Sequence, residues 1–551
     1  MPQRDHWDYI IVGAGSAGCV LANRLSEDAQ ARVLLLEAGG PDRHPLIHIP
    51  LGVGKMHEHT MFDWGLESEP EAALDGRRVE AMRGKVLGGS SSINVMTCTR
   101  GDRGDYDRWA RNGARGWSYD EVLPYFRRSE RWEGGANTLR GGDGPTGVRF
   151  SPFIDPLNDA WLEAARAAGY AWTDDCNGAQ HEGFSRGQNF IDRGRRASAA
   201  VSYLHPVRAR RNLKVLTGVR ANRVLIEQGR ARGVEYVHQG RVIRAQAQCE
   251  VILSSGTFNT PQLLMLSGIG PASALQALGI PVIADLPVGR NLQDHPTVGL
   301  GFARRTPGPF HAQMRADRIA MSMLRAWCFG TGPATVLPSG IYAFIKSRAG
   351  LDVPDLEFMF RCAPARPRIW FPGVRPAGTD GFGVRPAVVQ PKSRGEVSLR
   401  SVDPGDRVRI RFNLLSEAQD TATLTDGVER ARELAASPAL DAFRAAEITP
   451  GPKVRTRSEI EAWVRSTVIT VHHPSSTCPM GEGEQAVVDC ALRVRGVDGL
   501  RVVDASVMPD IVSAHINACV LMIAERAADL IRDRTPRGAS AESVASELLP
   551  V

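Results

Sequence analysis

Residues 8–18 read Asp-Tyr-Ile-Ile-Val-Gly-Ala-Gly-Ser-Ala-Gly, an apolar run that leads directly into a Gly-x-Gly-x-x-Gly turn. In the strand–turn–helix unit that this pattern predicts, Gly13 permits the tight turn and Gly15 lets the backbone approach a pyrophosphate. Gly18 lets the helix pack closely on the sheet, and the free N–H groups at the helix start are available to phosphate oxygens. The sequence therefore predicts a dinucleotide site near the N-terminus.

A second apolar run, over residues 33–36, ends at Glu37, about 20 residues after Gly18, which is the spacing typical of this kind of site. A carboxylate here accepts hydrogen bonds from a ribose diol and repels a 2′-phosphate, so NADP is disfavoured. Gly-x-Gly-x-x-Gly alone also occurs in purely structural turns. The two strands, the amphipathic helix between them and the acidic residue together favour the dinucleotide interpretation.

The composition is that of a large soluble protein. A chain of 551 residues with 43% hydrophobic content exceeds the size at which one core usually suffices, so two joined domains are expected. The net charge of +6 is small for this length, and no basic run interleaved with aromatic residues indicates nucleic acid as a partner. Nine cysteines without a Cys-x-x-Cys pair argue against a disulfide framework or structural zinc and favour a reducing compartment.

The chain shows no targeting or membrane segment by pattern. Residues 1–7 are polar rather than typical of a signal peptide, and no uninterrupted apolar run reaches transmembrane length. We therefore expect a cytoplasmic protein. Residues 535–551 are rich in Ala, Ser and Glu and are predicted to form a flexible tail.

Two further glycine-rich stretches lie in the first half of the chain. Residues 83–94, Arg-Gly-Lys-Val-Leu-Gly-Gly-Ser-Ser-Ser-Ile-Asn, supply backbone and hydroxyl donors where a planar polar ligand must come close. A Ser/Gly linker is the alternative, but apolar residues flank the loop. Residues 256–270 predict a turn, a helix that starts at Pro261 and a stop at Gly268.

The C-terminal third holds the histidines with the most reactive setting. His472 and His473 end an apolar run, and adjacent side chains on an extended backbone face opposite ways, so at most one should address a given ligand. Either histidine could instead be a hydrogen-bonded structural residue. A metal site with Cys478 is disfavoured, because the histidines diverge and no zinc spacing is present.

Residues 499–531 predict a strand, a turn and a helix. Asp504 stands at the turn, where it could bind a ligand or merely cap the turn. His515 directly precedes a helix that begins near Asn517, as judged from apolar spacing. The positive end of the helix dipole therefore points at whatever His515 contacts.

These motifs, in this order, resemble the glucose–methanol–choline (GMC) family of FAD-dependent oxidoreductases. The resemblance extends from residue 9 to about residue 532, and the bacterial alcohol, choline and L-sorbose dehydrogenase branch is the most similar. The motifs that carry it are residues 83–94, 256–270, 291–295, 391–395, 473–481 and 503–506, with branch-specific similarity at 45–52 and 116–119.

The resemblance implies an α/β fold with two domains. A Rossmann-like FAD-binding domain would comprise residues 1–155, 210–298 and 485–534. A discontinuous substrate-binding domain, built on an antiparallel sheet, would comprise residues 156–209 and 299–484.

The resemblance also implies the residues that hold FAD. Relatives with covalent flavin carry a histidine where this chain has Ile93, so the FAD is expected to be noncovalent. The expected cofactor-binding residues are Gly13, Gly15, Ser16, Ala17, Gly18, Glu37, Ala38, Gly84, Gly89, Ser90, Ser91, Asn94, Val95, Val219, Gly256, Asp504, Ala505, His515, Ile516 and Asn517.

The implied activity is oxidation of a primary alcohol to an aldehyde, by proton abstraction and hydride transfer to flavin N5. His473 matches the catalytic histidine of the family and His515 its partner position. Close dehydrogenase relatives carry an Asn-Thr-Asn-type sequence where this chain reads His515-Ile-Asn517, so oxidase and dehydrogenase both stay open, with oxygen or a quinone-type compound as acceptor. The alternatives are a hydroxynitrile-type lyase that uses the same histidines without net redox chemistry and a noncatalytic flavin-binding protein.

The residues that recognise the alcohol are the least defined. Arg361, Arg366, Arg368 and Arg375 fall in the region expected to line the entrance, where they could bind an anionic substrate group or be solvated loop residues. Trp370 and Phe371 would suit an aryl alcohol. No metal ion and no nucleic acid are expected as partners.

Overall fold

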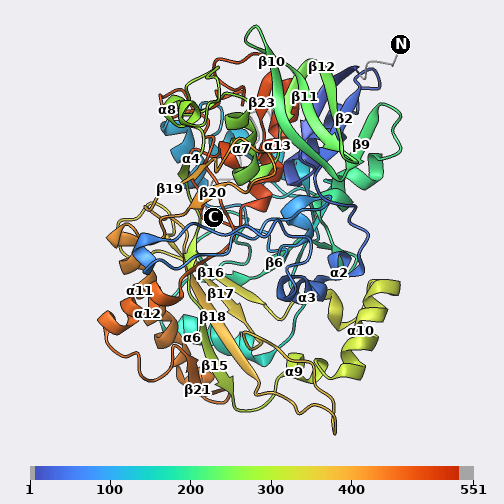
Figure 1. Cartoon of the computed structure of the whole chain (residues 1–551). Helices are drawn as coiled ribbons and strands as arrows, with labels where there is room; N and C mark the ends of the chain where they lie inside the picture. Colours follow the sequence, from blue (N-terminus) through green and yellow to red (C-terminus); the bar gives the residue numbers. More distant parts are fainter. Residues whose placement is uncertain (1–5, 533–551) are drawn as a thin grey trace, which may run out of the picture.

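The computed structural model describes residues 6–532, so the tail predicted for residues 535–551 lies outside the described residues. Two β-sheets lie one above the other along the long axis of the molecule (Figure 1). Each sheet has its own cluster of buried apolar side chains. This arrangement confirms the predicted α/β fold with a Rossmann-like domain and a second domain on an antiparallel sheet.

The upper sheet is parallel at its centre. β1 pairs in parallel with β2 and with β12, and β2 pairs in parallel with β9. β2 is buried along its whole length, as is typical of parallel strands covered on both faces. The strand order is β10 (Val219–Glu227), β11 (Arg230–His238), β12 (Arg241–Leu253), β1 (His6–Val12), β2 (Val33–Glu37) and β9 (Leu213–Thr217), with β23 (Leu500–Val502) beside β12.

Two helices that are far apart in the sequence start side by side against this sheet. The Ser16 hydroxyl at the start of α1 (Ser16–Leu25) donates to Asn517 Oδ1, 2.7 Å away, at the start of α13 (Asn517–Ile531). Farther along, Arg24 donates twice to the buried Glu525 carboxylate, at 2.9 and 2.7 Å. The N-termini of both helices therefore lie at one place, as expected for the helix that begins near Asn517.

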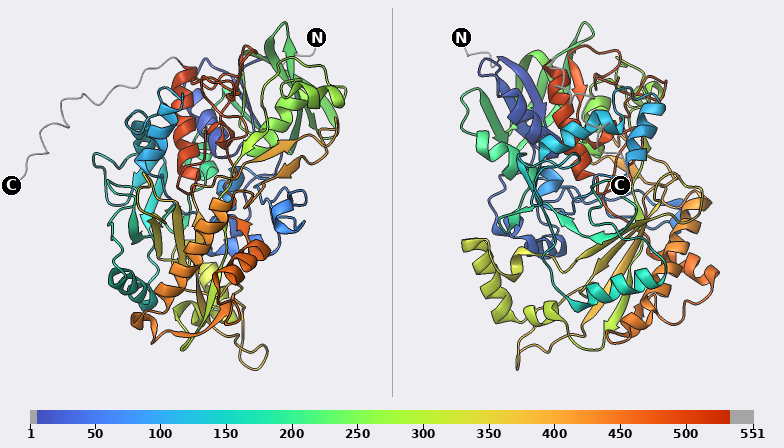
Figure 2. Two further views of the ribbon diagram at one scale, coloured as in Figure 1. Left: turned by 90° about the vertical axis from the view of Figure 1, so that its left-hand side faces the viewer. Right: turned by 180° about the vertical axis from the view of Figure 1, so that it is seen from behind.

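The lower sheet is antiparallel throughout its main path. α6 (Pro156–Ala167), α11 (Ala418–Ala435) and α12 (Arg457–Thr467) lie along its outer side (Figure 2). The strand order is β21 (Arg444–Thr449), β15 (Leu300–Arg304), β18 (Gly381–Val388), β17 (Leu356–Arg361), β16 (Ile341–Ile345) and β5 (Gly183–Arg186), with β14 (Pro296–Thr297) beside β18 and β22 (Ile469–Thr470).

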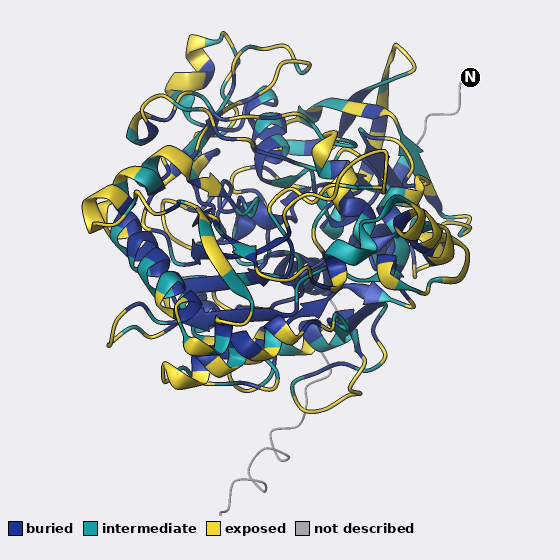
Figure 3. Ribbon diagram, turned by 90° about the horizontal axis from the view of Figure 1, so that it is seen from below, coloured by how far each residue is buried: buried dark blue, intermediate teal, exposed yellow. Residues whose placement is uncertain are grey.

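The remaining elements connect or flank the two sheets. Exposed residues gather on the outer helices and loops, whereas the strands seen between them are largely buried (Figure 3). These elements are α2 (Pro45–His48), α3 (Val53–Glu58), α4 (Arg103–Arg111), α5 (Tyr119–Ser129), α8 (Ala272–Ala277), α9 (Pro309–Gln313), α10 (Ala316–Phe329), and the short strands β3 (Glu130–Trp132), β4 (Thr146–Phe150), β6 (Gln188–Asn189), β7 (Ile191–Asp192), β8 (Arg195–Arg196), β13 (Arg290–Leu292), β19 (Gly395–Ser398) and β20 (Arg409–Arg411).

The chain crosses between the two sheets several times. β14 lies within the range 210–298 assigned to the FAD-binding domain, yet it pairs with strands of the lower sheet. Leu66, Leu74, Val79 and Ala81 fall within the range 1–155, yet they pack in the lower core. The elements predicted for each domain thus interleave, because segments that pass between the domains contribute side chains to both cores.

The helix predicted to start at Pro261 starts earlier. α7 spans Gly256–Leu266 and contains Pro261 in its interior. Its first turn is held by the Asp504 carboxylate, where Oδ2 accepts from Gly256 N at 2.9 Å and from Thr260 Oγ1 at 2.6 Å. The first bond satisfies a backbone N–H group at the helix start. A proline at that position would have no N–H group to satisfy.

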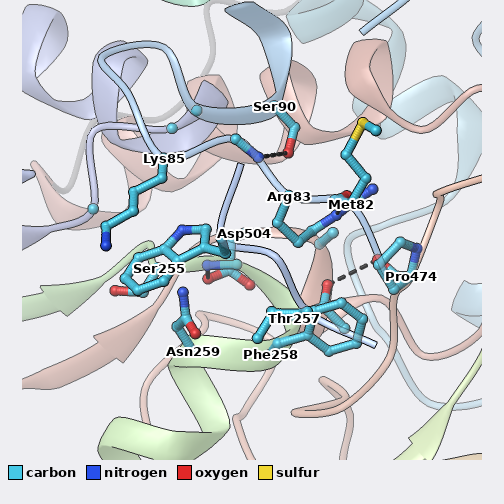
Figure 4. Close-up of a pocket in the computed structure, with 18 of the residues that line it drawn as sticks. Met82, Arg83, Lys85, Ser90, Ser255, Thr257, Phe258, Asn259, Pro474 and Asp504 are labelled. Carbon is cyan, nitrogen blue, oxygen red and sulfur yellow. Dashed lines mark hydrogen bonds between the residues drawn. The ribbon is translucent and has the colours of Figure 1, made fainter. Parts of the chain in front are cut away.

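The interior proline leaves one helix carbonyl without its usual donor. Pro261 has no N–H, so the Thr257 carbonyl four residues earlier receives no helical bond from it. The Thr477 hydroxyl fills this place, donating to Thr257 O at 2.8 Å. In return the Thr257 hydroxyl donates to Pro474 O at 2.8 Å (Figure 4). The segment that follows the two adjacent histidines is thereby fixed to α7.

Of the helices within residues 6–532, none combines the length and the apolar character that a membrane span requires.

Replacing Thr477 by Val should lower the free energy of unfolding by about 1–2 kcal/mol, because the buried Thr257 carbonyl loses its donor. In a Pro261→Ala background the new backbone N–H can bond to Thr257 O, so the same substitution should cost less than half as much. Urea unfolding followed by tryptophan fluorescence measures both differences.

Thr467→Val is the matched control for this cycle, because Thr467 is exposed and only back-bonds to a helix carbonyl, and its unfolding free energy should change by less than about 0.5 kcal/mol. Equal costs of Thr477→Val in the two backgrounds would contradict the assignment of this bond.

Candidate active site

A cavity of about 580 Å³ lies between the two sheets, within the size range of small-molecule and cofactor sites. At one end it reaches the N-termini of α1 and α13, lined by Ser16, Ala17 and Asn517. At the other end it reaches the lower sheet, lined by Met359 and Arg385. Both domains therefore contribute to a single site.

The glycines of the first motif are required by close contacts. Gly13 has a φ of +101°, and a Cβ there would lie 2.4 Å from Ser254 O. A Cβ on Gly18 would lie 1.9 Å from Gly13 O and 3.5 Å from Ile11 Cγ2, so this glycine lets the helix pack closely on the end of the first strand, as predicted. A Cβ on Gly89 would lie 2.7 Å from the Gly15 Cα. The two glycine-rich loops thus pack against each other at the cavity wall.

Glu37 is fixed by the backbone around it. Its carboxylate oxygens accept from Ala14 N at 2.9 Å and Gly39 N at 2.7 Å. Burial raises its pKa to about 7, against the lowering effect of those backbone bonds. Each carboxylate oxygen keeps a lone pair, and the residue lines the cavity, so it can also accept from a ribose hydroxyl.

Most residues predicted to bind the cofactor lie in the cavity lining. Ser91 and Gly18 do not. Ser91 is buried behind the loop, where its hydroxyl donates to Gly88 O at 2.6 Å and accepts from Ala199 N at 3.0 Å. The lining members are Gly13, Gly15, Ser16, Ala17, Glu37, Ala38, Gly84, Gly89, Ser90, Asn94, Val95, Val219, Gly256, Asp504, Ala505, His515, Ile516 and Asn517.

The lining fits a flavin dinucleotide. Two helix N-termini offer free N–H groups beside each other, the arrangement that favours phosphate oxygens. Gly256 has a φ of +83°, and a Cβ there would meet no atom within 4 Å, so the backbone leaves room for a ligand. Together with Glu37, these features match the phosphate and ribose parts of FAD.

The histidine end is assembled by a short pair of strands. β14 and β22 pair antiparallel, with Pro296 opposite Thr470. His295 directly precedes β14, and His473 follows shortly after β22. Asp294 Oδ1 accepts from the backbone N–H groups of both His295 and His473, each at 2.8 Å. One carboxylate oxygen thus joins two distant segments.

The expectation of an extended backbone at the two adjacent histidines is wrong. His472 has a φ of +63°, so the backbone is not extended there, and both His472 and His473 line the cavity. The Arg83 guanidinium donates to the His472 carbonyl. Alternation along a strand does not apply once the chain turns into the left-handed region.

His473 lies between two other histidines. Its Nδ1 is 3.1 Å from His295 Nδ1, and its ring centroid is 4.7 Å from that of His515, with the planes at 79°. His515 Nε2 is 2.8 Å from Oε1 of Glu357, a fully buried residue on β17. The structure therefore brings together the two histidines predicted to cooperate and adds a partner for each.

Sequence reasoning missed His295 and Glu357 as members of the site. His295 stood in a recognised motif but had no visible partner. Glu357 interrupts the otherwise apolar run Leu356–Phe360, and a carboxylate within a buried strand must find a partner. That interruption was the available signal for Glu357.

Burial keeps these imidazoles neutral. It lowers the pKa of His473 well below the usual value, and the neighbouring His515, His295 and Arg83 lower it further. Burial likewise lowers the pKa of His295 and of His472 to about 3. In the tautomer in which His473 Nδ1–H donates to His295, the Nε2 lone pair of His473 is free to take a proton.

The residues predicted to line the entrance belong to the end of β17 and to the loop that follows it, and they lie outside this cavity. Arg361, Arg366, Arg368 and Arg375 are absent from the cavity lining, as are Trp370 and Phe371. Arg366 and Arg368 line a smaller pocket with Phe310 and His311. The loop is bound to the α9–α10 region, through Ala316 N to Trp370 O at 2.8 Å and Trp370 Nε1 to His311 O at 3.1 Å.

Within residues 6–532, no group of three or more His, Cys, Asp or Glu side chains is arranged to hold a metal ion. All nine cysteines are free thiols.

Comparison with known proteins identifies the family. A family model described as GMC oxidoreductase matches residues 7–297, and a second with that description matches residues 391–524. The oxygen-dependent choline dehydrogenase of Photobacterium profundum is 43% identical over 540 residues, which cover 96% of this chain and 94% of that protein. The mitochondrial choline dehydrogenase of Homo sapiens is 44% identical over 541 residues, with 96% and 90% covered.

Solved structures show the same relationship. Pyridoxine 4-oxidase from Mesorbium loti superposes with a TM-score of 0.85 at 32% identity, covering 96% of this chain and all of that chain. A formate oxidase superposes with a TM-score of 0.87 at 28% identity, covering 96% and 98%. The glycine-lined cavity and its histidine pair thus occur in a chain that belongs to the GMC oxidoreductase family, as an FAD-dependent enzyme acting on CH–OH donors.

Proposed function

We propose that this protein oxidises a primary alcohol to an aldehyde, with His473 as the general base and His515 as its hydrogen-bonding partner. The observation that carries the proposal is a pair of imidazoles, 4.7 Å apart between ring centroids, at the end of an FAD-type cavity. A lone histidine is commonly structural, whereas this pair faces a cavity that already holds the features of a dinucleotide site.

His473 has the properties of a base for an alcohol. Its lowered pKa keeps the ring neutral at neutral pH, so it can accept the hydroxyl proton without first losing one of its own. The bond between its Nδ1 and His295 Nδ1 holds the ring and reserves Nε2 for the substrate. The Asp294 carboxylate accepts a hydrogen bond from the backbone N–H of His473, which holds the loop that carries the base in place.

His515 is held on the other side of the base. Its backbone N–H donates to Thr99 Oγ1 at 2.8 Å, and its Nε2 is bonded to Glu357. Two anchors on one residue keep its ring beside that of His473, where it can orient the substrate oxygen. We therefore assign Glu357 as a positioning residue for His515.

The cofactor completes the chemistry. FAD, when bound, accepts the hydride from the alcohol carbon at flavin N5. We propose that Glu37 and the N-termini of α1 and α13 hold its ribose and phosphates, and that Ile93 leaves the flavin noncovalently bound. Ser90, Asn94 and Val95 also line the cavity and would contact the flavin ring.

The identity of the alcohol and of the electron acceptor is inferred from the names of relatives. The relatives reported above are choline dehydrogenases by name, which supports an alcohol as the substrate class. The name of the Photobacterium profundum relative includes oxygen dependence, which supports oxygen as one acceptor, with a quinone-type compound as the other. A cytoplasmic location remains a prediction from the sequence.

Replacing His473 by Ala should slow flavin reduction by about 10²-fold or more, the usual scale for losing a general base, while the protein still binds FAD. Stopped-flow mixing of oxidised holoenzyme with a panel of primary alcohols under anaerobic conditions measures the rate as bleaching of the flavin band. His472→Asn is the matched control, because its ring lies in the same cavity without a bond to His473 or His515, and it should cost less than about 10-fold.

Undiminished flavin reduction in His473→Ala would refute the base assignment. A flavin that no alcohol bleaches, together with cyanide release from a cyanohydrin, would replace the oxidoreductase proposal with a lyase.

The pH profile provides a separate prediction. Because burial lowers the pKa of His473, the base stays neutral as the pH falls through 6.5, and the acid limb of the reduction rate should lie below about pH 6. The buried histidines of lowered pKa take up protons near pH 6.5 in the unfolded chain but not in the folded one. The free energy of unfolding therefore decreases as the pH falls below about 6.5. Rates should therefore be measured by pH jump from neutral buffer, and an acid limb at or above pH 6.5 would contradict the prediction.

A further inference from the structure

We infer that the alcohol oxidised here carries an anionic group, such as a carboxylate, and that Arg385 binds this group at the histidine end of the cavity. The inference rests on the proposed function for its hydroxyl chemistry. It adds the class of substrate, a hydroxy acid, which the family membership leaves open.

Arg385 lies on the cavity-facing side of the lower sheet. It pairs with Met359 across β17 and β18, and both residues line the cavity. Gly299 lies beside its stem, where a Cβ would be 3.7 Å from Arg385 Cγ. The positive charge of Arg385 contributes to the lowered pKa of His472, which places the guanidinium near the histidines rather than at the dinucleotide end.

Arg385 has no acceptor among the described residues, by hydrogen bond or ion pair. Two buried arginines, Arg304 and Arg140, illustrate the usual compensation. Arg304 binds both oxygens of Asp155 at 2.7 and 2.8 Å, and Arg140 binds Glu130 and Asp175. Proteins rarely bury a guanidinium without compensation. A cavity-lining guanidinium with its donors unused is suited to a planar anion.

A second arginine strengthens the positive field. Arg361, two residues beyond Met359 on β17, lies diagonally from Arg385 in the sheet register. It too lacks an acceptor among the described residues, and its Nε is buried. Burial and the nearby Arg385 lower the pKa of Arg361 to about 10. An anion bound at Arg385 would offset the repulsion between the two charges.

The described lining offers a cationic alcohol neither a carboxylate beside the histidines nor an aromatic cage. The carboxylates in the described lining are Glu37, Asp406 and Asp504, and two of them are bonded at the dinucleotide end. Glu357 is fully buried outside the lining and bonded to His515. Its negative charge opposes the lowering of the Arg385 pKa by burial, but it makes no hydrogen bond or ion pair with Arg385. Of the two non-histidine aromatic rings in this lining, Trp64 is already faced by Lys85 Nζ, 4.5 Å from its centroid, so no aromatic cage is present.

The first test compares three alcohols that differ in charge: 6-hydroxyhexanoate, 1-hexanol and choline. We expect the second-order rate constant for flavin reduction to be about 10²-fold higher for 6-hydroxyhexanoate than for 1-hexanol. It should be lowest for choline. Arg385→Met should lower the value for 6-hydroxyhexanoate by about 10²-fold, because a buried charge pair loses one partner. The preference for 6-hydroxyhexanoate over 1-hexanol, taken as the ratio of the two values, should therefore fall by a similar factor.

Arg368→Met is the matched control, since it makes the same change on the exposed loop at the smaller pocket, and it should leave all three values unchanged. Arg385→Lys, which keeps the charge without the bidentate geometry, should fall between wild type and Arg385→Met. An unchanged carboxylate preference in Arg385→Met would overturn the inference, as would a wild-type preference for choline.

A binding measurement separates this inference from the proposed function. Hexanoate has no hydroxyl group, so its binding to oxidised holoenzyme, followed by perturbation of the flavin spectrum or by calorimetry, requires no turnover. Binding in wild type that weakens at least 10-fold in Arg385→Met would support the anion site even if no alcohol reduced the flavin. Absence of hexanoate binding, or binding that is equal in the two proteins, would overturn it.

Discussion

The site depends on one carboxylate oxygen, Asp294 Oδ1. It accepts the backbone N–H groups of His295 and His473, which belong to segments almost 180 residues apart, and so fixes the distance between the proposed base and its neighbour. Burial raises the pKa of Asp294 to about 7, and the Arg83 charge opposes that rise. Arg83 also bonds to the His472 carbonyl, so the same charge steadies both the carboxylate and the histidine loop.

Around Asp294, hydrogen bonds connect elements of the two domains. α7 begins at the Asp504 carboxylate of the upper domain and holds the loop after His473 through Thr257 and Thr477. His515 leads into α13 of the upper domain but is bonded to Glu357 of the lower sheet. The dinucleotide site and the histidines are therefore positioned by one connected set of hydrogen bonds.

The charge arrangement divides the cavity into two functional ends. Glu37 and two helix N-termini characterise the dinucleotide end. At the opposite end, burial keeps His295, His472 and His473 neutral, while Arg385 stays without an acceptor among the described residues. Neutral imidazoles are compatible with a nearby guanidinium, because its positive charge disfavours their protonation. The same neighbourhood can thus remove a proton and hold an anion.

Features that depend on local sterics and short-range spacing could be predicted from the sequence alone. Gly13 and Gly18 have no room for a Cβ. Glu37 follows at a fixed distance along one βαβ unit. The helix after His515 is visible in the helical spacing of its apolar residues. The other features arise only in the folded chain. Packing placed both His472 and His473 in the cavity through a left-handed residue, moved the start of α7 ahead of Pro261, and paired His473 with His295 and His515 with Glu357. It also placed Arg385 in the cavity lining and left Arg366 and Arg368 outside it. These outcomes depend on strand register and on contacts between segments far apart in the chain, which no local pattern encodes.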